Sequence, residues 1–163
     1  MKKILLISDT HGYIDEKIIK YANKVDEIWH AGDIGDISVT DKLKQIKPLK
    51  GVYGNIDDQK IRAEFPLHNR FICEKVSVWI THIGGYPKRY NPKILEELKS
   101  NPPDLFICGH SHILKVINDK ELDLLHMNPG AIGKYGLHRV RTMIQFEING
   151  KKIENLSVIE FER

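Results

Sequence analysis

The chain has 163 residues, the length of one ordinary domain, and we expect a single domain over residues 1–163. It is 41% hydrophobic and 29% charged, which excludes a disordered or fibrous chain and supplies enough apolar side chains for a core. The net charge is only +3, from 25 Lys and Arg against 22 Asp and Glu, so we expect no specific nucleic-acid binding.

The N-terminal residues and the cysteines bear on the location of the protein. The first residues include two lysines, but Asp9 interrupts the apolar stretch too early for a secretory signal. No apolar run approaches the ~20 residues that a membrane-spanning helix needs. Two cysteines, Cys73 and Cys108, are too few for a disulfide framework. We therefore expect a cytoplasmic protein without a membrane partner.

Five short apolar runs in the first two thirds of the chain are typical of buried strands. They cover residues 4–7, 27–30, 49–53, 76–80 and 105–108. Apolar residues at helical spacing predict a helix over residues 14–22, a brief helix around Leu43 and Ile46, and a helix that starts at Asn91. Strands and helices thus alternate, as they do in layered α/β domains.

After residue 113 the apolar residues recur with the period of two that is typical of strands. Residues 114–117 and 122–125 flank Asn-Asp-Lys, and residues 143–148 and 153–161 flank Asn-Gly. Asn-Gly between two alternating runs is a strong hairpin signal. Two antiparallel hairpins are therefore expected to complete one layered α/β domain.

Each of the five predicted strands is followed by a polar residue that can bind a metal ion. These residues are, in chain order, Asp9, Asp33, Asn55, His82 and His110. The carboxyl ends of strands meet at one edge of an open sheet, so we expect these side chains to converge. His11 and His112 lie two residues beyond Asp9 and His110, and residues i and i+2 of an extended segment point the same way. The sequence therefore predicts seven candidate ligands at one edge.

Each motif has a structural explanation when it is taken alone. The Asp-Thr-His-Gly of residues 9–12 could cap the following helix, and Gly32-Asp33 and Gly54-Asn55 are ordinary turn sequences. His82 could be a hydrogen-bonded core histidine, whereas Gly-His-Ser-His at residues 109–112 favours metal binding by itself. Because all five motifs follow strands of one chain, we favour a shared metal centre over five separate structural roles.

The donor set of these seven residues restricts both the metal and the chemistry. Carboxylates, imidazoles and an amide without thiolates suit Mn²⁺, Fe, Zn²⁺ or Ni²⁺ better than they suit a structural zinc ion. Seven ligands are too many for one tetrahedral ion and suit two ions that share a carboxylate. Two ions can hold both oxygens of a displacement at phosphorus and activate water. We expect phosphoester hydrolysis with two divalent ions, Mn²⁺ first, and Fe, Zn²⁺, Ni²⁺ or Mg²⁺ as alternatives.

The residues and their order resemble those of the calcineurin-like metallophosphoesterases, and most closely the small YfcE-type phosphodiesterase branch, from residue 4 to about 131. The resemblance implies a four-layer αββα sandwich of two mixed β-sheets flanked by helices. It implies that one ion is held by Asp9, His11 and His112, the other by Asn55, His82 and His110, and that Asp33 is shared. It also implies that Asp33 and Asn55 are catalytic, and that Asp57 orients a ligand without binding metal.

One motif departs from the family pattern. The family commonly has Gly-Asn-His followed by an acid, whereas this chain has Gly54-Asn55-Ile56-Asp57. Isoleucine cannot protonate a leaving oxygen, and general acid catalysis is worth roughly 10²–10⁴-fold. We therefore predict a phosphodiesterase that uses a hydroxide between two metal ions and acts slowly on alkyl phosphomonoesters. His138 is a candidate substrate contact, with a structural role as the alternative.

The expected partner is a small phosphodiester or nucleotide substrate, and the resemblance implies a homodimer or a larger homo-oligomer. The alternative function is a protein-interaction scaffold, because the retromer subunit Vps29 resembles this branch and lacks the same histidine. Against this alternative, every ligand position here keeps a residue that can bind metal. Packing or surface roles are expected for the remaining candidates: Trp29, His30, His68, Trp79, Cys108, His126 and the loop of residues 85–90.

Overall fold

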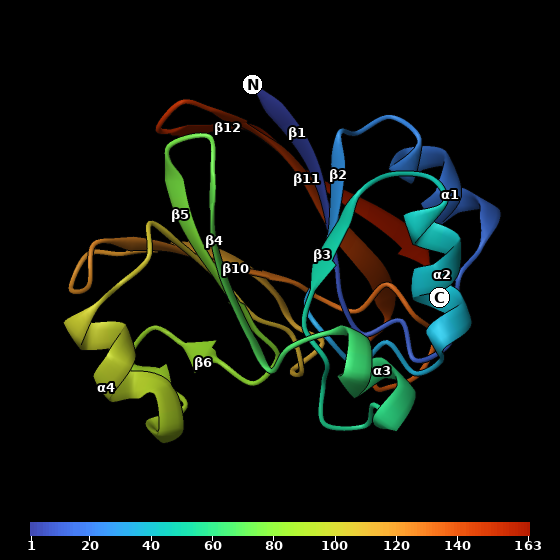
Figure 1. Ribbon diagram of the computed structural model, residues 1–163, viewed down its shortest axis with the longest axis horizontal. Coiled ribbons are helices and arrows are strands. Elements are labelled where there is room, and N and C mark those ends of the chain that lie inside the picture. The colour runs from blue at the N-terminus through green and yellow to red at the C-terminus, as the bar shows by residue number, and fades with distance from the viewer.

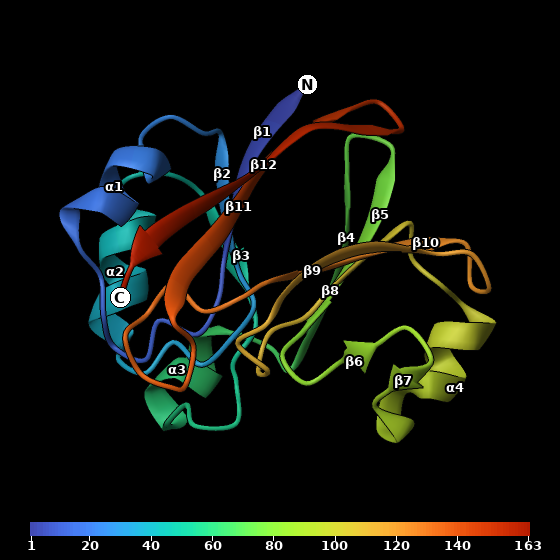
Figure 2. The ribbon, with the colours of Figure 1, turned by 180° about the vertical axis from the view of Figure 1, so that it is seen from behind.

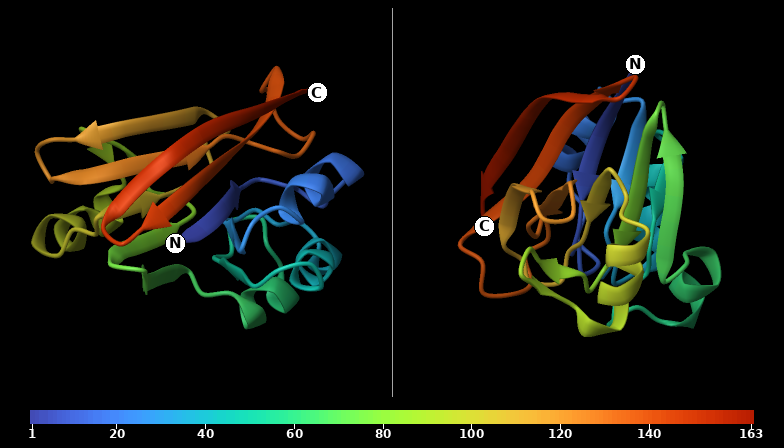
Figure 3. Two further views of the ribbon diagram at one scale, coloured as in Figure 1. Left: turned by 90° about the horizontal axis from the view of Figure 1, so that it is seen from above. Right: turned by 90° about the vertical axis from the view of Figure 1, so that its left-hand side faces the viewer.

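Two five-stranded β-sheets lie face to face in the computed structural model, which describes residues 1–163 (Figures 1 and 3). Alternate side chains of β1 (Lys2–Ile7) show how the layers are held. Ile4 and Leu6 pack in a cluster with the second sheet, whereas Leu5 and Ile7 pack with the helices on the outer face. The resulting order of helices, sheet, sheet and helix confirms the predicted αββα sandwich.

The first sheet has the strand order β12-β11-β1-β2-β3. Its parallel half consists of β1, β2 (Glu27–His30) and β3 (Leu49–Gly51). The chain returns to this sheet at its end, where β11 (Val140–Asn149) and β12 (Lys152–Glu162) form a hairpin and β11 pairs antiparallel with β1. The hairpin predicted at Asn-Gly is therefore confirmed, and it lies beside the first strand of the chain.

The second sheet has the strand order β4-β5-β8-β10-β9, with β5, β8 and β10 parallel. Its strands are β4 (His68–Cys73), β5 (Val76–Thr81), β8 (Leu105–Ile107), β9 (Leu114–Asp119) and β10 (Leu124–Pro129). The other predicted hairpin is confirmed as β9 and β10. The sequence analysis missed β4, an edge strand with only one buried side chain, so its apolar pattern is weak.

Four short helices cover the outer faces of the sheets (Figure 2). They are α1 (Glu16–Ala22), α2 (Ile37–Lys44), α3 (Gln59–Glu64) and α4 (Pro92–Ser100). Each begins after a residue whose side chain accepts a first-turn backbone N–H: Asp15, Asp36, Asp58 and Asn91. None of these helices has the length and apolar character needed to cross a bilayer.

The structure differs from the sequence prediction at several element boundaries. The first helix starts at Glu16 because Asp15 caps it, and α2 runs from Ile37 to Lys44, so Ile46 lies beyond its end. The short α3, with a single buried residue, was missed. Instead of a solvated loop, residues 85–90 form a small hairpin of β6 (Gly85–Tyr86) and β7 (Arg89–Tyr90), because the buried Tyr90 ring packs on the second sheet.

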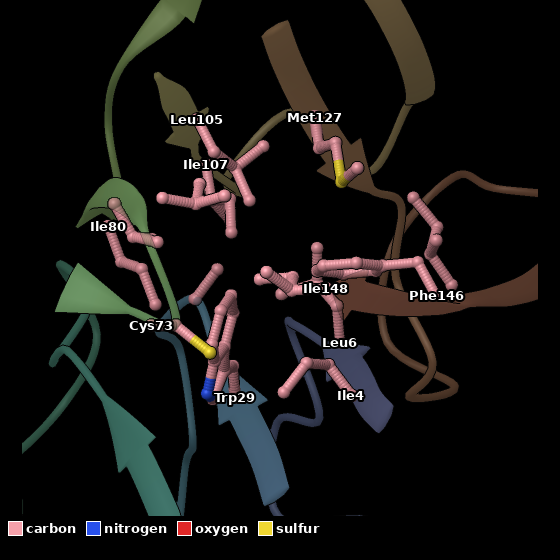
Figure 4. Packing of buried hydrophobic residues seen from close by; sticks show 14 of the residues in the cluster. Ile4, Leu6, Trp29, Cys73, Ile80, Leu105, Ile107, Met127, Phe146 and Ile148 are labelled. Carbon is pink, nitrogen blue, oxygen red and sulfur yellow. The ribbon is translucent and has the colours of Figure 1, made fainter. Parts of the chain in front are cut away.

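The largest core cluster fills the space between the two sheets (Figure 4). Trp29 is fully buried there and meets the rings of Phe71 and Phe146 edge to face. Trp79 is buried on the other side of the second sheet, against α4. Both tryptophans therefore have the packing role predicted for them, and the rigid sheets fix the positions of the loops that leave their strands.

Candidate metal centre

The loops that follow five strands of the two sheets bring the predicted ligands together. Two groups of side chains form, each with its ligand atoms within 4.8 Å of one another. The first consists of Asp9, His11 and His112, and the second of Asp33, His82 and His110. The carboxamide oxygen of Asn55 lies 3.1 Å from Nδ1 of His110, so Asn55 belongs beside the second group. All seven predicted residues thus meet at one place.

Asp33 lies between the two groups. Its Oδ2 atom is 3.5 Å from Nε2 of His11 in the first group and 3.2 Å from Nε2 of His82 in the second. Its other oxygen accepts a hydrogen bond from the backbone N–H of Ile56, which fixes the orientation of the carboxylate. One oxygen atom of Asp33 can therefore reach ligand atoms of both groups.

Five of the seven candidate ligands have a backbone conformation that L-residues rarely adopt. The φ angles are 55° at Asp9, 45° at His11, 53° at Asp33, 72° at His110 and 63° at His112. Such left-handed residues cost free energy and cluster at functional sites, where the surrounding structure holds them in place. The concentration of this strain in the candidate ligands is an argument for a functional site that does not depend on motif similarity.

Two glycines allow these loops to approach the carboxylates closely. A Cβ atom on Gly54 would lie 2.1 Å from Oδ1 of Asp33, and one on Gly109 would lie 2.2 Å from Oγ of Ser8 and 2.8 Å from Oδ2 of Asp9. Any side chain at either position would displace a carboxylate or its neighbours. Glycine is therefore required here by close packing rather than by turn geometry alone.

Several buried polar atoms of the site have no hydrogen-bond partner within the protein. They are Oδ1 of Asp9, Nε2 of His11 and Nε2 of His82. Buried polar atoms are normally paired, because leaving them unpaired is costly. Nδ1 of His82 donates to the carbonyl of Ala31 at 2.7 Å, which leaves Nε2 as a free lone pair, as in metal-binding histidines. The donor atoms present therefore fit divalent metal ions.

The electrostatics of the site keep its two aspartates ionised. Burial disfavours the charged form of Asp9, but the favourable interaction with the nearby His11 and His112 imidazoles outweighs it and lowers the pKa of Asp9. Burial also disfavours the charged form of Asp33. The interaction with His82 outweighs this effect, so the pKa of Asp33 is lowered as well. Two buried carboxylates side by side create a strong negative potential, which favours cations at this place.

Asp57 holds the loops that carry Asp33 and Asn55. Its Oδ2 accepts hydrogen bonds from the backbone N–H groups of Gly54 at 2.7 Å and Ile34 at 3.1 Å. Its Oδ1 accepts from the N–H of Gly35 at 2.8 Å. The buried Asp57 side chain thus links the residue before Asn55 to the two residues after Asp33. Asp57 itself belongs to neither ligand group.

We expect Asp57→Asn to lower the metal affinity, and any metal-dependent hydrolysis of a test phosphodiester, about 10- to 100-fold, the usual effect of removing a group that orients ligands. The amide would place N–H donors against backbone N–H groups and loosen the loop of Asp33. Isothermal titration with Mn²⁺ and hydrolysis of bis-p-nitrophenyl phosphate measure the two effects. Asp41→Asn, at an exposed position of α2, is the matched control. Wild-type metal affinity in folded Asp57→Asn protein would contradict the assignment.

The structure places His138 beside the first group of ligands. Its ring meets the ring of His112 edge to face at 5.2 Å, and its Nε2 donates to the carbonyl of Gly133 at 2.8 Å. This hydrogen bond engages Nε2 in supporting the loop, and the other ring nitrogen, Nδ1, is buried without a partner. The substrate role predicted for His138 stays a prediction, because the side chain also supports its own loop.

The sequence analysis missed two side chains that contact candidate ligands and one that contacts the residue between two of them. Ser8 donates a hydrogen bond to Oδ2 of Asp9 at 2.6 Å, and the exposed ring of Tyr135 stacks on His11 with 4.8 Å between ring centres. The hydroxyl of Tyr86 contacts Oγ of Ser111 between the two histidines of the 109–112 motif. Only Ser8 had a local signal, its place next to Asp9, since the other contacts join distant segments.

Two buried groups near the site are unsuited to acid–base or nucleophilic chemistry. Burial lowers the pKa of His30 to about 4, and its ring accepts from the N–H of Gly32 and contacts the hydroxyl of Thr10. Burial raises the pKa of the Cys108 thiol to about 12. His30 is therefore a neutral residue that supports the loop, and Cys108 is a small core residue, as expected.

A family model for the calcineurin-like phosphoesterase superfamily domain matches residues 1–151. The chain belongs to this family. It is 31% identical over 134 residues to a probable metallophosphoesterase of Methanocaldococcus jannaschii, an alignment that covers 77% of this chain and 66% of that protein. It is 30% identical over 149 residues to a probable metallophosphoesterase of Mycoplasma pneumoniae, covering 83% and 87%. The chain thus spans just under two thirds of the first relative.

Solved structures share the fold at lower sequence identity. Vps29 of Entamoeba histolytica, solved with Zn²⁺, aligns with a TM-score of 0.75 and 15% identity over 98% of each chain. A structure described as that of a novel archaeal phosphodiesterase aligns with a TM-score of 0.67 and 20% identity, covering 96% of this chain and 99% of that chain. These similarities confirm the expected relation in fold to Vps29 and to the small phosphoesterases.

Proposed function

We propose that this protein is a phosphodiesterase that uses two divalent metal ions. The observation that carries the proposal is the position of Asp33, whose Oδ2 lies within 3.5 Å of ligand atoms of both candidate groups. Family membership supports phosphoester hydrolysis in general, and the archaeal structural relative described as a phosphodiesterase supports this kind of ester. The seven ligands are assigned as the family resemblance implies: Asp9, His11 and His112 would hold one ion, Asn55, His82 and His110 the other, and Asp33 would serve both.

The side chains of the site would bind and orient the substrate for attack by water on phosphorus. Bound ions supply Lewis-acid polarisation of the phosphoryl oxygens and lower the pKa of water towards neutrality. Asn55, next to His110, would help to stabilise the negative charge that develops on the non-bridging oxygens. Asp57 would keep Asp33 and Asn55 in place through its three backbone hydrogen bonds. The attacking water would lose a proton to solvent as its oxygen bonds to phosphorus, the bond to one ester oxygen would break, and that oxygen would take a proton from solvent.

Ile56 favours diesters with acidic leaving groups as substrates. Its side chain is 48% exposed beside Asn55 and has no proton to donate. A leaving alkoxide of high basicity would therefore leave unassisted, at a cost of roughly 10²–10⁴-fold. We further propose that the substrate is a small phosphodiester or nucleotide and that Mn²⁺ is the preferred ion. We also propose that the protein is cytoplasmic, consists of a single domain and forms a homo-oligomer.

Metal removal tests the proposal most directly. We expect the protein to hydrolyse bis-p-nitrophenyl phosphate faster than p-nitrophenyl phosphate, to lose this activity after chelation, and to regain it when Mn²⁺ is added. The release of p-nitrophenol is followed by absorbance, and Mg²⁺, Zn²⁺, Ni²⁺ and Fe²⁺ are compared in parallel. Circular dichroism before and after chelation serves as the control for folding.

The outcomes of this experiment separate the two candidate functions. Hydrolysis that requires a divalent ion supports the phosphodiesterase, and a preference for the monoester would contradict the role given to Ile56. A folded protein that is inactive with every ion would contradict the enzyme and favour the interaction scaffold. In that case a search for a protein partner would replace the search for a substrate.

A further inference from the structure

A cavity of about 320 Å³ opens directly beside the candidate metal centre. Asn55 and His82 form the wall that it shares with the centre. Further lining comes from α3, from the first residue of β4, from the start of α4 and from the loops that adjoin them. Figure 1 shows α3 and α4 on opposite sides of the lower ends of β4 and β5. One molecule could therefore occupy this cavity and place its phosphorus atom at the metal centre.

The charged groups around the cavity are all basic. Arg62 and Lys93 line it together with the imidazole of His68, whose pKa is lowered by burial, and no acidic residue lines it. Neither Arg62 nor Lys93 forms an ion pair with a carboxylate of the chain. Arg62 donates Nε to the carbonyl of Asp57 and Nη2 to that of Asn55, which leaves Nη1 without a partner. The cavity thus offers unpaired donors and positive charge to an anion.

Part of the cavity wall is apolar and includes an aromatic ring. Tyr53, Leu67, Ile83 and Ile94 line it, and Leu67 and Ile83 are 48% and 40% exposed. The Arg62 guanidinium lies 4.6 Å from the centre of the Tyr53 ring, so the cationic and apolar parts of the wall adjoin each other. A cavity of this size with apolar walls and a few polar groups is typical of a small-molecule site.

We propose that this cavity binds one ester arm of the phosphodiester substrate and selects an arm that combines an apolar ring with a second phosphate, as a nucleoside phosphate does. The proposal rests on the phosphodiesterase function proposed above, because the arm belongs to a diester whose central phosphate would lie at the adjoining metal centre. The apolar wall would contact the ring, and Lys93 and the free edge of Arg62 would meet the second phosphate. As proposed above, the bond that breaks joins phosphorus to one ester oxygen.

A pair of substrates that differ only in the second phosphate tests this selection. Diadenylate with a 5′-phosphate and diadenylate without it contain the same ester bond. We expect the Mn²⁺-loaded protein to hydrolyse the 5′-phosphorylated form with a kcat/KM about tenfold higher, the effect of roughly one good charge-assisted contact. Lys93→Gln should reduce this ratio about threefold or more, whereas Lys99→Gln, at the exposed end of the same helix, should leave it unchanged.

Equilibrium binding provides a second readout that does not require turnover. With a chelator present, calorimetry should show tighter binding of the 5′-phosphorylated dinucleotide to the wild-type protein, and Lys93→Gln should reduce the difference. Equal kcat/KM values, or a preference that Lys93→Gln does not change, would overturn the assignment of the cavity. If bis-p-nitrophenyl phosphate is hydrolysed and the dinucleotides are not distinguished, only the cavity proposal fails. If no ester is hydrolysed, the phosphodiesterase fails, and the binding difference alone decides the cavity.

Discussion

Asp33→Ala is expected to lower kcat/KM for bis-p-nitrophenyl phosphate by on the order of 10³-fold or more. One oxygen of Asp33 lies 3.5 Å from His11 and 3.2 Å from His82, so the substitution removes a ligand from both proposed ions at once. No neighbouring side chain can replace it, because the other carboxylate of the centre, Asp9, already faces His11 and His112. The measurement is steady-state hydrolysis at saturating Mn²⁺, together with the number of ions bound.

Asp33→Asn separates the charge of this residue from its shape. The amide keeps an oxygen that can accept the N–H of Ile56, which is 3.2 Å away in the wild-type protein. We therefore expect a folded variant with weakened metal binding and a loss of activity close to that of Asp33→Ala. Asp41→Ala, which removes an exposed carboxylate from α2, should keep full activity. More than a tenth of the wild-type activity in Asp33→Ala would contradict a shared ligand.

Ile56→His is expected to raise the rate on alkyl phosphomonoesters about 10²-fold, within the range of general acid catalysis. The position suits such a gain because the Ile56 side chain is 48% exposed beside Asn55. The interaction of this residue with Asp33 uses the backbone N–H, so the substitution leaves it in place. The variant should also depend less on the acidity of the leaving group, because the imidazolium can protonate the departing oxygen.

A series of aryl and alkyl phosphates with leaving groups of different pKa measures this change. The slope of log kcat/KM against leaving-group pKa should be shallower for Ile56→His than for the wild-type protein. Ile56→Gln is the matched control, since it adds a polar side chain of similar length that cannot act as an acid. Equal gains in the His and Gln variants would show that polarity, and not proton donation, limits the wild-type protein.

Most of the fold could be predicted because its elements have strong local signals. The buried strands β1, β2, β5 and β8 contain short, mostly apolar runs, and the hairpin of β11 and β12 has Asn-Gly at its turn. The half-exposed edge strand β4 and the short α3 lack such signals. The β6–β7 hairpin forms because the Tyr90 ring finds a buried place against Phe106, a contact between segments that are far apart in the sequence.

The seven candidate ligands could be identified from the sequence because each follows a strand end, and strand ends and turns are encoded by nearby residues. The left-handed backbone of Asp9, His11 and Asp33 was not predictable in this way. It is imposed by contacts such as that of Gly54 with Asp33, which joins segments more than 20 residues apart. The same holds for Tyr135 on His11 and for the three backbone bonds of Asp57.

The sequence by itself determined most of the order of strands, helices and turns, the identity of the candidate ligands and the presence of isoleucine in place of histidine at position 56, because these depend on residue type and local spacing. Only the tertiary structure decided that Asp33 lies between the two ligand groups and that Arg62 and Lys93 line one cavity beside them. These features are distances between side chains from different loops. Such distances follow from how the two sheets pack, which is a property of the whole core.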